Sequence, residues 1–361
     1  MRTDSPIRLA SARAWRTYTG GSLIDRINGT GDGKDSHFPE DWIMSTVRAI
    51  NAGREEIVEG LNMIDGTDMT LRDLVAADPA ATLGAGHVAR WGETCGVLVK
   101  VIDAAERLAV QVHPDKPHAR AFFNSPFGKT ECWHILGGRT IDGEEPCVYM
   151  GFKPGITQAD WRRCFDEQDI PAMLGWMHRL PARPGDTFLI EGGVPHAIGR
   201  GCLLMEIQEP TDFTLRTEKV TPQGLRLSEL QCHGGIGFDR MFACFAYEGL
   251  SEADVRRRWC PVPRTLAQSA AFTCRELVGP AETPCFTLMR YDIRESCAFP
   301  AADGFSGLYV FAGRGRLRSA AGDVPVTPGS QFFVPAACAP FTLAAAPAAP
   351  LVIFRALPPA A

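Results

Sequence analysis

The stretch that decides the fold runs Gly185-Asp-Thr-Phe-Leu-Ile-Glu-Gly-Gly-Val-Pro-His196. Its segment Thr187-Phe-Leu-Ile190 is mostly apolar and is typical of a short buried strand. The strand pattern stops at Gly192-Gly193, and a histidine follows three residues later. Because glycine adopts positive φ angles without a steric penalty, this turn can fold His196 back over the open end of a β-barrel. The stretch therefore predicts a β structure with a chemically useful side chain at a strand end.

Similar strand patterns dominate the rest of the chain, while helical patterns are few. Apolar or alternating runs bounded by Gly and Pro occur at residues 96–102, 108–113, 203–208, 286–291, 306–311, 314–318, 331–334 and 351–354. Helix-start signals precede Leu71, follow Thr157 and begin at Ser251. We therefore expect a mostly β protein with two cupin-like, jelly-roll β-barrel domains. The first, residues 1–250, carries small helical insertions, and the second comprises residues 251–361.

The composition narrows the classes of function. The chain has 361 residues, 45% hydrophobic and 22% charged, which is typical of a folded globular protein. Its formal charge is 37 − 42 = −5, so the chain has no basic surplus for a nucleic-acid backbone. Its 12 cysteines include no C-x-x-C pair and predict no zinc ribbon or disulfide scaffold. Scattered thiols and the lack of a signal-peptide pattern favour a cytoplasmic location.

One uncharged stretch, residues 324–354, could be mistaken for a membrane span. It contains six prolines, each of which removes a backbone hydrogen-bond donor. A helix in lipid cannot satisfy so many interruptions, so we expect short strands there and no membrane partner.

Residues 109–115, Ala-Val-Gln-Val-His-Pro-Asp, place two metal-capable groups on one strand face. Side chains alternate along a strand, so Gln111 and His113 point the same way, about 6.6 Å apart. This pair fits either shared metal ligation or an ordinary hydrogen bond between two polar side chains.

A second candidate is Gly128-Lys-Thr-Glu131. Lys129 and Glu131 on one strand face would usually be a solvated ion pair of small stabilising effect. Here Cys132 and Trp133 follow directly, which favours burial. A buried carboxylate needs a compensating partner, and a metal ion is one such partner.

Taken together, these segments resemble the cupin metal site, with Glu191 standing where the usual motif has proline. More specifically, four ordered segments resemble the type I mannose-6-phosphate isomerases, in their short bacterial form, over about residues 15–245. The segments are Val110-Gln-Val-His-Pro114, Gly128-Lys-Thr-Glu131, Pro195-His-Ala-Ile-Gly199, and Leu204-Met-Glu-Ile-Gln208 followed by Arg216.

The resemblance implies a site and a reaction. It implies a divalent ion, usually zinc and with other divalent metals open, held by Gln111, His113, Glu131 and His196. Arg216 matches the family's catalytic arginine, Lys129 and Glu206 match polar residues of the same cavity, and Asp212 lies four residues before Arg216. The implied activity is the metal-dependent interconversion of mannose 6-phosphate and fructose 6-phosphate through an enediolate.

Several alternatives stay open at the level of single residues. The proton carrier could be Lys129, Asp212, Glu206 or a metal-bound water. Asp212 and Arg216 could instead form an i, i+4 pair on a helix surface. Glu206 and Gln208 share a strand face and could simply meet solvent.

The resemblance is incomplete where the sugar phosphate would bind. Family members often carry a serine at the position of Ala109, and that serine helps to hold the phosphate. Replacement charge could come from Arg139, Lys153, Arg216 or Lys219. The small-molecule partner is then a sugar phosphate, another hexose phosphate or an unphosphorylated sugar.

A regulatory, sugar-binding cupin without catalysis is a further alternative. A cupin oxygenase fits less well, because it typically has more histidine ligands. The oligomeric state is open.

Overall fold

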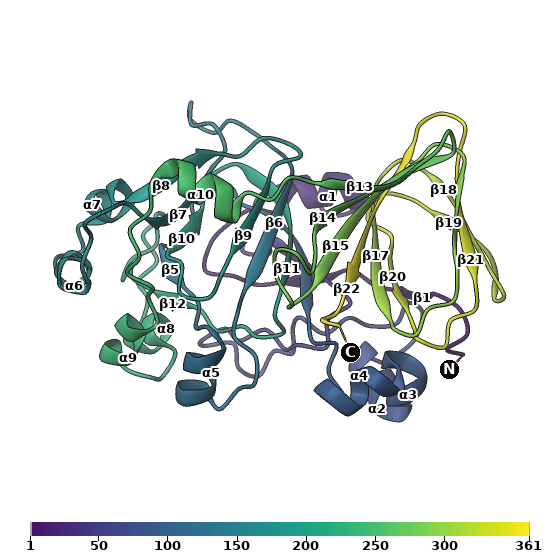
Figure 1. The fold of residues 1–361 in the computed structure, drawn as a ribbon, viewed down its shortest axis with the longest axis horizontal. Coiled ribbons are helices and arrows are strands. Elements are labelled where there is room, and N and C mark those ends of the chain that lie inside the picture. Colours follow the sequence, from purple (N-terminus) through teal and green to yellow (C-terminus); the bar gives the residue numbers. More distant parts are fainter. Residues whose placement is uncertain (1, 361) are drawn as a thin grey trace.

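The computed structural model describes residues 2–360 and is built mainly from antiparallel strands (Figure 1). Within these residues the strands form four sheets, which pack in pairs as two sandwiches side by side along the long axis of the molecule. We call them the N-terminal sandwich and the C-terminal sandwich. The prediction of a mostly β fold with two barrel-like units and small helices is confirmed.

The N-terminal sandwich pairs a six-stranded sheet with a five-stranded sheet. The six-stranded sheet has the order β2 (Ala12–Ala14), β3 (Glu40–Ile43), β4 (Leu98–Asp103), β11 (Cys202–Gln208), β6 (Glu131–Gly138) and β9 (Thr187–Ile190). The five-stranded sheet has the order β12 (Leu215–Arg216), β5 (Gln111–Val112), β10 (His196–Ile198), β7 (Cys147–Phe152) and β8 (Met177–Pro181).

The C-terminal sandwich pairs a seven-stranded sheet with a four-stranded sheet. The larger sheet has the order β1 (Ile7–Leu9), β20 (Gln331–Val334), β17 (Ser306–Ala312), β22 (Leu351–Leu357), β15 (Thr287–Ile293), β14 (Phe272–Val278) and β13 (Arg264–Gln268). The smaller sheet has the order β16 (Ser296–Phe299), β21 (Phe341–Ala345), β18 (Gly315–Ser319) and β19 (Gly322–Val326).

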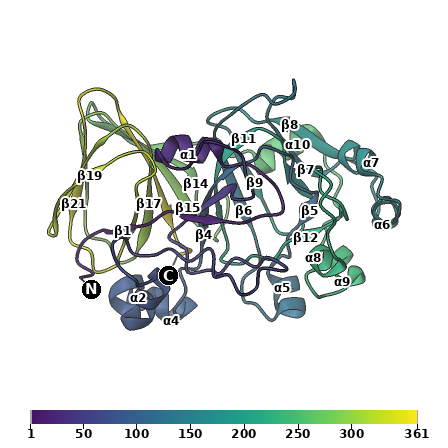
Figure 2. The same ribbon diagram turned by 180° about the vertical axis from the view of Figure 1, so that it is seen from behind.

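Short helices cover the ends and one outer face of the sandwiches (Figures 1 and 2). They are α1 (Ser22–Asn28), α2 (Leu71–Ala77), α3 (Pro79–Leu83), α4 (Ala85–Trp91), α5 (Lys116–Phe123), α6 (Gln158–Glu167), α7 (Ile170–Gly175), α8 (Glu229–His233), α9 (Phe238–Ala243) and α10 (Glu252–Trp259). Helices α6, α7 and α9 pack on the outer face of the five-stranded sheet. Helices α2–α4 lie near both chain ends, beside the C-terminal sandwich.

The two sandwiches meet through the six-stranded and seven-stranded sheets, which explains why β4 and β11 are buried on both faces. On β4, Val99 and Val101 belong to the core between the sandwiches, whereas Ile102 belongs to the core inside the N-terminal sandwich. Lys100 lies on the inner face, and its side chain is also buried. Alternation along a strand therefore aims one face of the six-stranded sheet into the N-terminal sandwich.

The helix-start signals in the sequence correspond to capped helices. Thr70 and Thr157 form capping boxes at α2 and α6, and Ser251 accepts a hydrogen bond from the Asp254 amide at the start of α10. Residues 108–113 differ from expectation, because only Gln111–Val112 is a strand. The Val110 amide donates to the side chain of Glu218 instead of to a neighbouring strand.

The predicted boundary between residues 250 and 251 stays a prediction. The N-terminal β1 lies on the edge of the seven-stranded sheet, and α10 contributes Val255 and Trp259 to the core of the N-terminal sandwich. Residues 324–354 form short strands from β19 to β22, as expected. No helix within residues 2–360 is long and apolar enough to cross a membrane.

Candidate functional site

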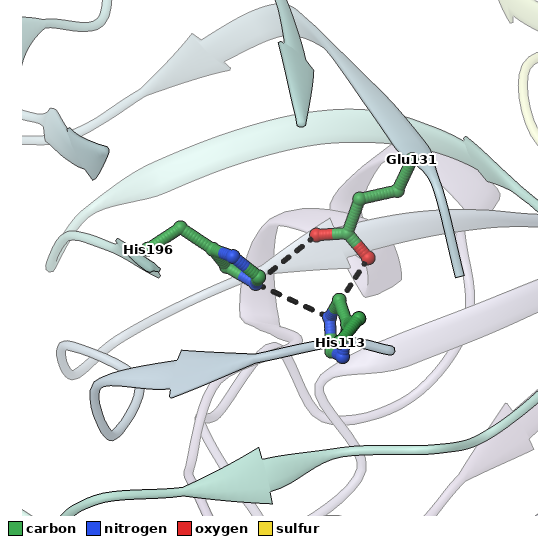
Figure 3. Close-up of side chains that lie close together, drawn as sticks. All are labelled: His113, Glu131 and His196. Atoms are coloured by element: carbon green, nitrogen blue, oxygen red, sulfur yellow. Dashed lines mark hydrogen bonds and ion pairs between the residues drawn. The ribbon is translucent and has the colours of Figure 1, made fainter. Parts of the chain in front are cut away.

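Three buried side chains converge inside the N-terminal sandwich (Figure 3). One ligand-capable atom from each of His113, Glu131 and His196 lies within 4.8 Å of the others. The two imidazole Nε2 atoms are 3.2 Å apart, and they lie 3.2 and 3.4 Å from the carboxylate oxygens of Glu131. We call these residues the triad. His113 and His196 are 83 positions apart in the sequence, and the pairing of strands brings them together.

Strand pairing brings the triad together. His196 is the first residue of β10 and pairs with Gln111 of β5, directly before the stretch that carries His113. Glu131 is the first residue of β6, in the facing sheet. The turn before β10 has Gly193 at a φ of 91°, and its amide donates to the His113 carbonyl at 2.8 Å. The Gly-Gly turn thus positions both histidines, as the sequence suggested for His196.

The orientation of each imidazole is fixed by its other nitrogen. Nδ1 of His113 lies 2.7 Å from the Phe213 carbonyl oxygen, and Nδ1 of His196 lies 2.8 Å from that of Val194. A carbonyl only accepts hydrogen bonds, so each Nδ1 carries the proton. Both Nε2 lone pairs are then directed toward Glu131, the arrangement typical of histidines that bind metals.

The donor atoms fit a divalent ion. Ligands at bond lengths of about 2.0–2.1 Å in a tetrahedron lie about 3.3 Å apart, close to the separations in the triad. One carboxylate oxygen of Glu131, Oε1, is buried without a hydrogen-bond partner within the described residues. The amide of Gln111 lies 3.2 Å from Nε2 of His196, so it is placed to complete a set of four. The role of these four residues as ligands stays a prediction.

The electrostatics favour the metal-binding protonation states. Burial, with the charge of Lys129, lowers the pKa of His113 to about 3, and burial also lowers the pKa of His196. Both imidazoles are therefore neutral near pH 7. Burial opposes ionisation of Glu131, but the charge of Lys129 outweighs it and the pKa of this carboxyl falls well below its usual range. Two neutral imidazoles and a carboxylate are ready-made ligands.

Beside the triad, a hollow opens between the two sheets. Its polar lining consists of Arg16, Thr17, Tyr18, Glu40, Lys100, Arg107, Gln111, Lys129, Glu206, Asp212, Thr214, Arg216 and Thr221. All four residues predicted to act in catalysis therefore line one space, together with Gln111. Ala109 also lines it.

Lys129 makes a buried contact with the triad. Its Nζ donates to Oε2 of Glu131 at 2.8 Å and lies 2.7 Å from Nε2 of His113. The side chain of Lys129 is 4% exposed, so the solvated surface pair considered from the sequence is not what forms. Lys129 precedes β6 rather than lying on it.

Glu206 faces the hollow and does not meet solvent. On β11, Glu206 and Gln208 are both buried and lie on the inner face, opposite to Met205 and Ile207. The indole of Trp133 donates to Oε2 of Glu206 at 2.9 Å, and Nζ of Lys100 lies 2.9 Å from Oε1. Burial raises the pKa of Glu206 despite the opposing charge of Lys100.

Asp212 and Arg216 do not form the helix-surface pair considered from the sequence. Asp212 lies outside any helix and binds Arg16, while Arg216 ends β12 and donates to the Gln231 carbonyl at 2.9 Å. Cross-strand pairing places Arg216 directly opposite Gln111. Arg216 therefore lies at the end of the hollow that adjoins the triad.

Sequence reasoning missed several charged residues of the hollow. Arg16 lies 3.0 Å from Glu40, and Lys100 and Arg107 each face a carboxylate. Lys100 had a detectable signal, because a lysine inside an otherwise apolar strand needs a buried partner. Arg16 lies in a segment without a comparable pattern.

The side chains proposed to replace the missing phosphate-binding serine lie mostly elsewhere. Arg139 pairs with Asp35 at 2.7 Å, Lys153 donates to the Gly175 carbonyl, and Nζ of Lys219 lies 4.5 Å from the centre of the Phe165 ring. Among those four candidates, Arg216 alone lines the hollow within the described residues.

Comparison with known proteins shows what the chain is similar to. Residues 61–127 match the family model of the catalytic domain of type I phosphomannose isomerase. Over 259 residues the chain is 26% identical to a probable mannose-6-phosphate isomerase of Bacillus subtilis, GmuF, a match that covers 70% of this chain and 73% of that protein. This chain is related to the type I phosphomannose isomerases. The resemblance noted from the sequence motifs is confirmed.

Further phosphomannose isomerases match parts or all of the chain. The mannose-6-phosphate isomerase ManA of B. subtilis is 33% identical over 125 residues, or 35% of this chain and 37% of that protein. A crystal structure of mannose 6-phosphate isomerase from B. subtilis superposes with a TM-score of 0.74 at 20% identity, covering 98% of this chain and 99% of that chain. The structure of a putative mannosephosphate isomerase from Archaeoglobus fulgidus superposes with a TM-score of 0.74 at 19% identity, covering 100% of this chain and 100% of that chain. The shared fold thus includes the C-terminal sandwich.

Proposed function

We propose that the chain is a metal-dependent aldose–ketose isomerase that interconverts a mannose-type and a fructose-type sugar through an enediolate. The observation that carries the proposal is that Gln111, Lys129, Glu206 and Arg216 line one hollow, with Lys129 and Gln111 in contact with the triad. The relatedness to enzymes named mannose-6-phosphate isomerases supports the same reaction class. The sequence resemblance implies mannose 6-phosphate and fructose 6-phosphate as the pair, and the unphosphorylated sugars are the alternative pair.

The ion in this proposal is zinc, held by Gln111, His113, Glu131 and His196. A set of nitrogen and oxygen donors about 3.3 Å apart suits tetrahedral zinc, although the same donors also accept manganese, cobalt or iron. A bound divalent ion acts as a Lewis acid and stabilises negative charge on neighbouring sugar oxygens. The fixed Nδ1 hydrogen bonds of the histidines hold the ligands in place for it.

Arg216 is proposed to stabilise the charge that develops on the sugar. Isomerisation places negative charge on the oxygens of C1 and C2, and a guanidinium held at the adjoining end of the hollow provides a permanent positive contact. The hydrogen bond from Nη1 to the Gln231 carbonyl fixes the side chain without neutralising its charge. Arg216 therefore needs little reorganisation when the charge appears.

Glu206 is the best-supported proton carrier. A carboxylate that moves a proton between carbon atoms works best when its pKa lies closer to neutral than usual, and burial raises the pKa of Glu206. The indole of Trp133 and the ammonium of Lys100 hold the carboxylate in one orientation. Lys129 remains a competitor, because its Nζ lies at the triad. Asp212 is less suited, since Arg16 and the Ile50 amide occupy its oxygens.

The test is an isomerase assay on the purified full chain. The protein is stripped with a chelator, reloaded with zinc and incubated with mannose 6-phosphate and separately with mannose, and the ketose product is followed by NMR. We expect turnover only after reloading. Sugar binding without turnover in the zinc-loaded protein would favour the regulatory, sugar-binding alternative.

A further inference from the structure

Arg107, one of the residues that line the hollow, forms an ion pair with the buried carboxylate of Glu218. Nη1 and Nη2 of Arg107 donate to the two carboxylate oxygens of Glu218 at 2.5 and 2.9 Å. Nη1 also donates to the Leu108 carbonyl at 2.8 Å, and the side chain of Glu218 is 2% exposed. A two-point pair of this kind holds the guanidinium in one orientation and neutralises its charge.

The register of two neighbouring segments places this pair relative to the triad. Arg216 lies opposite Gln111, and the chain then continues so that the amide of Thr217 donates to the Val110 carbonyl at 2.9 Å. One residue further, Glu218 accepts the Val110 amide at 2.6 Å. Ala109 therefore lies about 7 Å along the chain from Gln111, on the side away from His113. The lining of the hollow includes Gln111, Ala109 and Arg107, so a sugar that has its C1 and C2 at the triad and lies along this segment brings its C6 end to Ala109 and Arg107.

The charges around the hollow leave no free cation at that end. Four of the five cationic side chains that line it lie within 4 Å of a carboxylate. The pairs are Arg16 with Glu40 and Asp212, Lys100 with Glu206, Arg107 with Glu218, and Lys129 with Glu131. The fifth, Arg216, has no carboxylate within that distance in residues 2–360, but it lies directly across from Gln111, one of the proposed metal ligands.

We infer that this hollow selects a sugar whose C6 end is an uncharged hydroxyl group, and that Glu218 determines this preference. A phosphate group carries a charge of about −1.5 to −2 near pH 7. Placed beside Arg107, it would meet a guanidinium that Glu218 already neutralises and the methyl group of Ala109. Burying such a charge without a free cation is unfavourable, whereas a hydroxyl group carries no charge that needs a counter-ion.

This inference rests on the proposed isomerase function, and the first experiment separates the two. Values of kcat/KM are measured for mannose and for mannose 6-phosphate with the zinc-loaded full chain. We expect mannose to be preferred at least tenfold. Equal or better use of mannose 6-phosphate would overturn the inference and leave the proposed function intact. Turnover of neither sugar would contradict the proposed function and, with it, the inference.

A second experiment tests the role of Glu218 directly. Glu218→Gln keeps the side-chain shape and an acceptor oxygen for the Val110 amide, but it removes the charge that neutralises Arg107. We expect kcat/KM for mannose 6-phosphate to rise at least tenfold relative to that for mannose. The double substitution Arg107→Met with Glu218→Gln should lose this gain, because the freed guanidinium is then absent.

The matched control is Glu276→Gln, which removes the carboxylate from the Arg264–Glu276 pair in the C-terminal sandwich. It should leave the sugar preference unchanged. Circular dichroism and thermal melting establish that each variant is folded. A folded Glu218→Gln protein with the wild-type preference would overturn the role of Glu218. Should that variant not fold, the wild-type preference for mannose over mannose 6-phosphate decides the inference by itself.

Discussion

The guanidinium of Arg16 donates to both carboxylate oxygens of Asp212, at 3.1 and 3.2 Å, across 196 residues of sequence. Neither side chain is more than 9% exposed. Arg16 also lies 3.0 Å from Glu40 and stacks over the ring of Trp42. The pair thus joins the start of the chain to the segment before β12, and it assigns Asp212 a structural partner that its spacing from Arg216 does not reveal.

Removing this arginine should strongly destabilise the fold. Arg16→Met leaves two buried carboxylates without their main cation, a change that typically costs about 3–5 kcal/mol of unfolding free energy. Urea denaturation at pH 7 measures the loss. Arg257→Met, which breaks the exposed pair between Arg257 and Asp254, is the control and should cost less than about 1 kcal/mol. A loss for Arg16→Met as small as that of the control would show that solvent reaches the Asp212 carboxylate.

Metal content tests the triad without relying on activity. His113→Ala and His196→Ala each remove one of the proposed ligands, and we expect zinc affinity to fall at least about 100-fold. The control is His134→Gln, because His134 is also buried on β6 but contacts Thr187 and Phe354 on the opposite face of the sheet. Zinc per chain after equilibrium dialysis is the measurement. Unchanged zinc content in both triad variants would place the ion elsewhere.

Much of the fold could be predicted from local patterns. The mostly apolar run of β4 and the alternating pattern of β11 can be recognised in the sequence, because these strands are six and seven residues long. The starts of α2, α6 and α10 can also be recognised, because a capping side chain stands directly before each helix. By contrast, β1 and β12 have three and two residues, too few to show a period. Their pairing depends on distant partners, as in Ile7 with Phe333.

The candidate site shows the same limit. The residues of the triad stood out because histidine and glutamate occupied motif positions, and the Gly-Gly turn indicated how His196 would be placed. The hollow beside it could not be derived, because Arg16, Glu40 and Lys100 become neighbours only through tertiary packing. The sequence also left open whether the side chain of Glu206 is buried or meets solvent. Alternation along a strand shows which residues share a face, but it does not show which face of the sheet other parts of the chain will cover.

The ionised carboxylate of Glu40 should contribute to the free energy of unfolding, and this contribution should be lost at acidic pH. Burial opposes its ionisation, but the charges of Arg16 and Lys100 outweigh burial and lower its pKa from 4.5 to about 2. A lowered carboxyl pKa contributes stability that is present above pH 4.5 and is lost as the pH falls toward 2. The contribution is about 3 kcal/mol.

The measurement compares wild type with Glu40→Gln in urea at a series of pH values from neutral down to about pH 3. The variant should be less stable at neutral pH, and the difference between the two proteins should shrink as the pH falls, because wild-type Glu40 gains a proton only on unfolding. A difference that stays constant over this range would mean that the carboxylate contributes through shape rather than charge.

Arg216 should matter for turnover far more than for stability or metal binding. Arg216→Lys keeps a positive charge but loses the planar donor geometry, and removing a preorganised donor of this kind typically lowers kcat by about 10²–10³-fold. Zinc content and melting temperature should stay near wild type, since Arg216 lacks a buried carboxylate partner within 4 Å in the described part of the chain. A large loss of bound zinc in this variant would instead assign Arg216 a role in holding the triad through Gln111.

The pH dependence of turnover distinguishes Glu206 from Lys129 as the proton carrier. With Glu206 as the base, kcat falls on the acidic side of a pKa that burial has raised above the usual carboxyl value, because the carboxylate must be ionised to accept a proton. Trp133→Phe removes the indole hydrogen bond that stabilises the ionised form. The acidic limb should therefore move to higher pH in Trp133→Phe and disappear, with most of the activity, in Glu206→Gln. An acidic limb that stays in place in Trp133→Phe, together with substantial turnover by Glu206→Gln, would assign the proton to Lys129.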